Sequence, residues 1–230
     1  MRRSLATLAT LLAFASPAVA EGPVVIELYT SQGCSSCPPA DEMLHDLAKR
    51  SDVIPLALHV DYWDYIGWAD IFASPEHTRR QQQYARVAGA GSIYTPQMVI
   101  AGENHVIGAK PMEVADAVAF HRGNPTGVSV SVSRSGNRLT ITGETLRALP
   151  NGTVVQVVRF SPQETVDIRR GENAGRQLSY ANIVTDWDVV GEWRGRGDLS
   201  MAVNVSGNAP IVVIVQEPGP GSVMATAVLR

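Results

Sequence analysis

The feature that most constrains the fold of this chain is the pair Cys34 and Cys37, its only two cysteines. An apolar run at 24–29, typical of a buried strand, comes just before them, and a helical pattern begins at Pro38. Two thiols at this spacing at the start of a helix share one face, so they can form a disulfide or bind a soft metal. Redox chemistry is therefore the first hypothesis.

The first twenty residues have the order of a secretory signal peptide. Arg2 and Arg3 precede an apolar run at 5–14, and small residues follow at 18–20. We therefore exclude residues 1–20 from the fold and expect an exported, periplasmic or secreted protein. Later stretches fall short of the roughly 18 uninterrupted apolar residues that a membrane helix needs, so no membrane span is expected in the mature chain.

The charge balance argues against nucleic acid as a partner. The chain has 19 Lys and Arg against 22 Asp and Glu, and losing two arginines with the leader takes its net charge from −3 to −5. A nucleic-acid-binding surface needs clustered positive charge to neutralise phosphates. A hydrophobic content of 45% indicates an ordinary globular core.

The short loop between the cysteines suits thiol exchange better than stabilisation. On the chain-entropy model a loop of this size contributes about 2 kcal/mol, less than the longer loops that structural disulfides usually close. Amide groups at the start of a helix lower the pKa of a nearby thiol, so we expect Cys34 to be the reactive and reachable sulfur. A local structural disulfide is the alternative.

Two parts of the mature chain have different periodicities. Residues 21–125 read as strand, helix, strand, helix, β-hairpin and helix, with an aromatic-rich segment at 61–68. From 126 to 230 apolar and polar residues alternate, which predicts a β-sandwich of about seven strands. This half shows no catalytic constellation, and we interpret it as a partner-binding or stabilising module. The aromatic segment either lines a substrate groove or caps the core.

The order of strand, Cys34-x-x-Cys37, helix and a later Thr95-Pro96 at the start of a strand resembles the thioredoxin fold. The resemblance implies that Cys34 attacks a substrate disulfide and that Cys37 resolves the mixed disulfide. It also implies a cis bond at Pro96, where substrate backbone docks. The fold class expected is an α/β thioredoxin-like domain followed by an all-β sandwich-like domain.

Four stretches, 27–41, 59–64, 94–98 and 170–173, are similar to a family of exported bacterial thioredoxin-like proteins that is catalogued as a domain of unknown function. The resemblance implies a fold and a periplasmic location but no substrate. We expect thiols or disulfides of proteins or small molecules as partners, and no cofactor. Because no histidine lies between the cysteines to stabilise the Cys34 thiolate, and because Asp41 adds negative charge nearby, we expect a milder oxidant than the periplasmic oxidases.

Glu27 has two interpretations. It precedes the cysteines on the expected buried strand, and related folds keep an acid near this position that assists proton transfer during resolution by the second cysteine. An unpaired buried carboxylate is costly, which favours a functional reason. Alternatively, Glu27 faces outward or pairs with a lysine.

A metal site is the competing hypothesis for the cysteine pair. Structural zinc needs four ligands, and the chain has no second cysteine pair. Cu(I) would suit two thiolates with His59, Met43 or Met98. The competing function is thus a non-enzymatic protein that binds copper or a partner.

Overall fold

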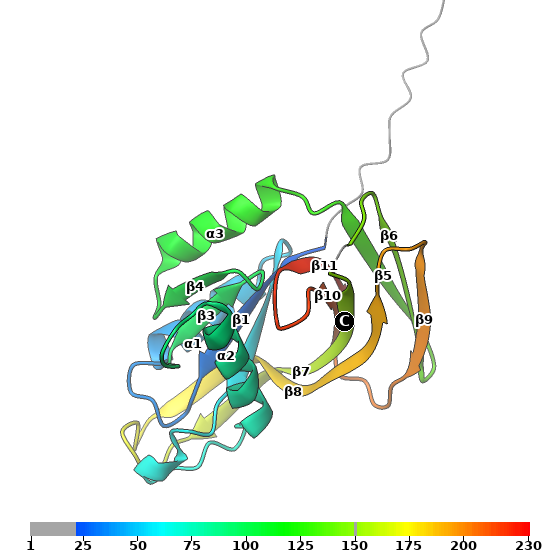
Figure 1. Cartoon of the computed structure of the whole chain (residues 1–230). Coiled ribbons are helices and arrows are strands. Elements are labelled where there is room, and N and C mark those ends of the chain that lie inside the picture. Colours follow the sequence, from blue (N-terminus) through cyan, green and yellow to red (C-terminus); the bar gives the residue numbers. More distant parts are fainter. Residues whose placement is uncertain (1–21, 150) are drawn as a thin grey trace, which may run out of the picture.

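The computed structural model describes residues 22–149 and 151–230, so the expected signal peptide lies outside the described residues (Figure 1). The order of elements agrees with the order expected from the sequence. They are β1 (Val24–Thr30), α1 (Pro38–Ala48), β2 (Val53–His59), the 3₁₀ helix η1 (Asp64–Ile66), α2 (Pro75–Val87), β3 (Gln97–Ile100), β4 (Asn104–Ile107), α3 (Pro111–Gly123), β5 (Val128–Ser135), β6 (Arg138–Thr145), β7 (Thr153–Asp167), β8 (Gln177–Trp193), β9 (Leu199–Asn204), β10 (Ile211–Gln216) and β11 (Val223–Leu229). Among the described helices, none is long and apolar enough to cross a membrane.

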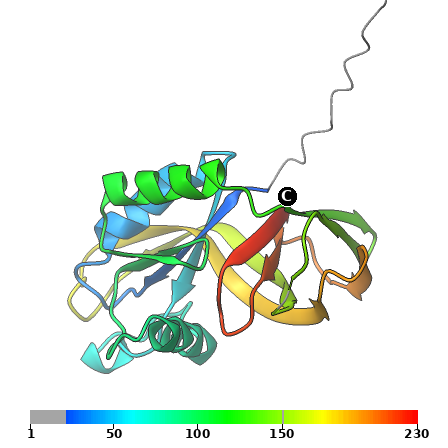
Figure 2. The same ribbon diagram turned by 45° about the horizontal axis from the view of Figure 1, so that its top comes forward.

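The main sheet has eight strands in the order β11-β10-β7-β8-β2-β1-β3-β4. β1 is parallel to β2 and antiparallel to β3, which is in turn antiparallel to β4. Helices α1 and α3 lie on one face of this sheet and α2 on the other (Figure 2). Strands covered on both faces must be apolar almost throughout, and β1 and β2 are.

Strands from both sides of the expected boundary near residue 126 belong to this one sheet. β8 is parallel to β2 at the pair Ala57 and Ile183. Beside it Asn182, with a left-handed φ of 48°, donates a hydrogen bond of 2.8 Å to the Pro55 carbonyl. One core cluster contains Tyr29 of β1 together with β7, β8 and β10 side chains. The two parts of the chain therefore share a sheet and a core.

The β-rich end forms the sandwich-like part of the molecule. A three-stranded sheet, β5-β6-β9, lies against β7, β10 and β11 of the main sheet (Figure 1). Its inward residues, such as Val128, Leu139 and Ile141, alternate with polar ones, as the period of two in the sequence requires.

Strands β7 and β8 connect the two ends of the molecule. They have 15 and 17 residues and form one long antiparallel pair that bends at two irregularities in register. The beginning of β7 and the end of β8 lie in the sandwich. The loop 168–176 that joins the two strands at their other end reaches the start of α1 (yellow in Figures 1 and 2). A loop from the second half of the chain is thus placed beside the cysteines.

Candidate functional site

Cys34 and Cys37 form a disulfide in the turn between β1 and α1, with their Cα atoms 5.4 Å apart. The Cys34 amide donates to the Ser31 carbonyl, and the Cys37 amide donates to the Cys34 carbonyl. The helix begins at Pro38 with Cys37 as its N-cap. Cys34 therefore lies in the turn before the helix, and the helix begins at Pro38 as the sequence predicted, since proline favours the first helical position.

The Cys34 side chain is only 1% exposed, so the expectation of a freely reachable sulfur is not met. Residues 61–72, called here the cover segment, pack over the loop that carries it. A Cβ at Gly33 would lie 3.2 Å from Ile66 and 3.3 Å from Trp63. The Ser36 hydroxyl lies 3.3 Å from Cys34 Sγ, and Ser36 itself is exposed. An exposed hydroxyl thus lies next to this buried sulfur.

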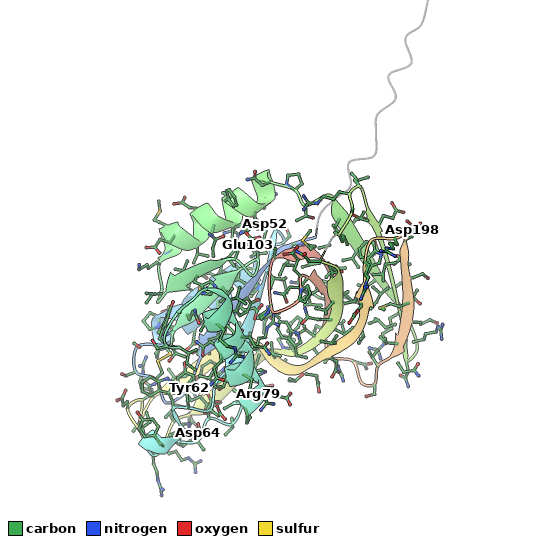
Figure 3. All side chains as sticks on the ribbon, in the orientation of Figure 1. Asp52, Tyr62, Asp64, Arg79, Glu103 and Asp198 are labelled. Carbon is green, nitrogen blue, oxygen red and sulfur yellow. A yellow bond between two sulfur atoms is a disulfide. The ribbon has the colours of Figure 1, made fainter. Side chains whose placement is uncertain are left out.

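The cover segment is anchored to the residue two before Cys34. Trp68 Nε1 donates to Gln32 Oε1 at 2.7 Å, and the backbone N–H of Gln32 donates to Asp70 Oδ2 at 2.8 Å. Figure 3 places Tyr62 and Asp64 of this segment at the opposite end of the sheet from Asp52, which precedes β2. The aromatic segment therefore caps the carboxyl ends of β1 and β2, where the cysteines are.

Thr95 and Pro96 lie at the same end of the sheet. Their peptide bond is cis, as the resemblance implied. They come directly before β3, whose Gln97 pairs with Tyr29 near the end of β1. Trp63 Nε1 donates a hydrogen bond of 2.7 Å to Thr95 Oγ1. Trp63 thus lies between the cysteine loop and the loop that carries Pro96.

The loop between β7 and β8 contributes Asn173, which the sequence analysis did not identify as a site residue. Its Nδ2 donates to the carbonyls of Gln32 and Cys34 at 2.9 and 3.0 Å, and the side chain is 1% exposed. Arg176 donates to Asn173 Oδ1 at 3.0 Å. The only signal in the sequence was the resemblance over 170–173. The second half, interpreted as outside the site, therefore holds the cysteine loop directly.

Gly171 fits this loop against the cover segment. Its φ of 77° lies in the left-handed region, and a Cβ there would lie 3.2 Å from the Trp68 side chain. Only glycine adopts this backbone at little cost while leaving room for Trp68.

Glu27 does not point toward the disulfide. Side chains alternate along β1, so Ile26 and Leu28 face α1 whereas Glu27 faces α2. It is fully buried in an ion pair with Arg80, with both N–O distances 2.7 Å. The hydroxyls of its neighbours Tyr29 and Tyr84 donate to it as well. The alternative interpretation, an ion pair, is the one observed, with an arginine in place of a lysine.

Arg80 joins the two halves of the chain on this face. Burial by itself would lower its pKa, but the negative charge of Glu27 outweighs that effect and raises the pKa above its usual range. Its guanidinium lies 3.9 Å from the centre of the Trp187 ring, and its Nη2 donates to Gln216 Oε1 at 3.0 Å. Glu27 and Arg80 therefore serve as a buried link between α2, β1, β8 and β10.

The acid on the α1 face is Asp41, one turn after Cys37. It is 5% exposed and accepts a hydrogen bond of 2.8 Å from Thr30 Oγ1. Burial, with a smaller contribution from Asp70, raises its pKa to about 7, against the opposing effects of His59 and Thr30. Unlike Glu27, this carboxyl lies on the same face of the sheet as the cysteine helix.

His59, a candidate copper ligand in the sequence, is fully buried and its Nδ1 lies 2.6 Å from Asp70 Oδ2. Its Nε2 has no hydrogen-bond partner within the described part of the chain. Met98, another candidate, is packed in the core under α1. In residues 22–149 and 151–230 there is no group of three or more His, Cys, Asp or Glu side chains that could hold a metal ion.

The chain resembles two solved structures. A crystal structure of a protein from Agrobacterium tumefaciens is 34% identical and covers 92% of this chain and 96% of its own, with a TM-score of 0.77. HBP35 of Porphyromonas gingivalis is 14% identical over 91% of this chain and 75% of its own, with a TM-score of 0.62, which shows a similar fold alone. No curated protein matches significantly. A family model described as a protein of unknown function, DUF1223, matches residues 25–216, and the chain therefore belongs to the DUF1223 family.

Proposed function

We propose that this protein is an exported, thioredoxin-like thiol-disulfide oxidoreductase in which Cys34 and Cys37 are the redox pair. The observation that carries the proposal is the disulfide in the turn between β1 and α1, at the same end of the sheet as Thr95 and Pro96. A disulfide that closes so short a loop stabilises a fold little, so we assign thiol–disulfide exchange to this pair.

Cys34 is the attacking sulfur and Cys37 the resolving one. Cys34 Sγ lies beside the exposed Ser36, whereas Cys37 is fully buried as the N-cap of α1. In the reduced protein the Cys34 thiolate attacks a substrate disulfide, forms a mixed disulfide and releases one substrate thiolate. Cys37 then attacks Cys34 Sγ, which restores the Cys34–Cys37 bond and releases the second thiolate.

The substrate backbone docks against Thr95 and Pro96, the role that the resemblance implies for them. Substrate access needs a displacement of the cover segment, because Cys34 is only 1% exposed with that segment in place. The hydrogen bond from Trp63 to Thr95 joins the segment to the docking residues. Substrate binding at Thr95 would compete with that bond and so expose the sulfur.

The test is a trapping experiment with the reduced Cys37→Ala variant and an exposed-disulfide substrate such as oxidised insulin. Removal of the resolving thiol should leave a covalent mixed disulfide at Cys34, visible on a non-reducing gel and reversed by dithiothreitol. The matched Cys34→Ala variant should trap little. If neither variant traps substrate, the pair is not an exchanging one and the protein is a binder.

A further inference from the structure

Three chemically active side chains form a stripe along one face of α1. Cys37, Asp41 and His45 are separated by four residues each, so they lie one above the other on the helix. Cys37 and Asp41 are both buried, and the bond from Thr30 to Asp41 shows that this face is turned toward the sheet.

A cavity of about 360 Å³ opens beside this stripe, between the start of α1 and β8. Asp41 and His45 both line it. His45 Nε2 is buried and makes no hydrogen bond to another described residue. Ser35, between the two cysteines, lies on the same cavity wall. A buried carboxyl one turn from Cys37 therefore has an opening toward solvent beside it.

The surroundings of Asp41 leave its charge only partly compensated. Thr30 donates a hydrogen bond to it, and Asp70 lies near enough to disfavour a second negative charge. A group in this position changes its protonation near neutral pH, as its pKa of about 7 reflects. The titratable and charged groups that face it are His59 of β2, Asp70 of the cover segment, Tyr180 of β8, and, around the cavity, Glu42, His45 and Arg176.

We propose that Asp41, rather than Glu27, exchanges the proton of Cys37 during resolution of the mixed disulfide, and that the cavity beside His45 carries that proton to solvent. The inference rests on the proposed function. The Asp41 carboxylate takes the proton from the Cys37 thiol. The resulting thiolate attacks Cys34 Sγ, the Cys34–Cys37 bond forms, the bond to the substrate sulfur breaks, and the electron pair leaves with the substrate thiolate. In the oxidising direction each step is reversed.

The experiment follows the reduced protein with 5,5′-dithiobis(2-nitrobenzoate) by stopped flow between pH 5 and 9. The first release of thionitrobenzoate reports attack by Cys34, and the second reports resolution by Cys37. Wild type should show a second phase whose rate rises through about pH 7. Asp41→Asn should slow that phase by about 10-fold to 100-fold and remove the inflection, while the first phase changes little.

Asp116→Asn, a neutralised aspartate on the exposed face of α3, is the matched control and should keep both phases. If wild type shows two phases and Asp41→Asn keeps the second with its pH profile, the inference about Asp41 is overturned while the proposed function stands. If wild type shows no second release, the proposed function itself fails. His45→Gln provides a second variant should Asp41→Asn not fold; it should lower the second-phase rate, and an unchanged rate would count against the cavity route.

Discussion

The disulfide end of the molecule and its sandwich end are built differently. Around the cysteines, buried polar groups of different elements bond to one another, as Asp41 does with Thr30 and His59 with Asp70. At the sandwich end, around Val128 and Leu139, the interior is an apolar cluster. Buried titratable groups are costly for stability, so their concentration around the cysteines supports the proposal of a functional site at this end.

The same comparison shows that the two ends are not independent units. Figure 3 places Tyr62 and Asp64 far from Asp198, yet β7 and β8 run from one end to the other. The loop between those strands delivers Asn173 to the cysteines. The sandwich end therefore anchors a hairpin whose other end is part of the site.

Removing residues 126–230 should have the largest effect. β2 would lose its neighbour β8, and the shared core would lose Phe160, Val184 and Val212. We expect the fragment 22–125 to show no cooperative thermal transition by circular dichroism, in contrast to a chain of residues 22–230. A folded fragment that still exchanges disulfides would show that the two ends are separate after all.

Arg80→Met should destabilise the protein by about 3–5 kcal/mol, because it leaves the Glu27 carboxylate buried without its ion pair. Urea unfolding measures the loss. A double variant, Glu27→Gln with Arg80→Met, should recover part of it because no charge then stays buried.

The rates of disulfide exchange in these variants should match wild type under conditions in which the variants are folded. The reason is that Glu27 and Arg80 lie on the face of the sheet away from α1. Slower resolution in Glu27→Gln would restore the catalytic role expected from the sequence.

Asp41 should make stability depend on pH in a defined direction. Folding raises the pKa of its carboxyl from 3.8 to about 7, so the folded protein binds this proton more tightly than the unfolded chain does. Its contribution to stability is therefore lost as pH rises from about 4 to about 7, by up to about 4 kcal/mol. Asp41→Asn should match wild type at pH 4 and exceed it in stability at pH 8, measured by urea unfolding. Equal pH dependence in both proteins would contradict this.

Asn173→Ala should cost about 1–3 kcal/mol, because it leaves two buried carbonyls of the cysteine loop without their donor. Reduced Cys34 in this variant should be alkylated faster by iodoacetamide than in wild type. Asn204→Ala, an exposed site on β9, is the matched control and should change neither quantity. An unaltered cysteine in Asn173→Ala would mean that the hairpin supports the fold and not the site.

Trp63→Phe should have the smallest effect, about 0.5–1.5 kcal/mol for the lost bond to Thr95. If this bond holds the cover segment closed, alkylation of reduced Cys34 should be up to about 10-fold faster. Trp193→Phe removes a comparable indole bond, to Gly197, at the sandwich end and should leave the alkylation rate unaltered. Equal rates in all three proteins would rule out the Trp63 bond as a restraint on access.

Much of the local structure could be predicted from periodicity. The orientation of Glu27 and the position of Asp41 in the site were not predicted. The buried runs of β1 and β2 and the alternation of β5 and β6 gave the right elements. The orientation of Glu27 depended on the register of β1 against α1, which a one-residue change in loop length reverses. Asp41 was noted only as a nearby charge, although its spacing from Cys37 was readable as one helical turn.

The sequence by itself determined the position of the cysteine pair between a buried strand and a helix, because apolar periodicity and Pro38 act over a few residues. Only the tertiary structure decided what surrounds it. Asn173 lies 141 residues from Gln32, whose carbonyl it contacts, and Trp63 and Ile66 of the cover segment lie against Gly33 beside the buried Cys34. Contacts between residues so distant in sequence depend on how the strands assemble into one sheet, and no local pattern contains that information.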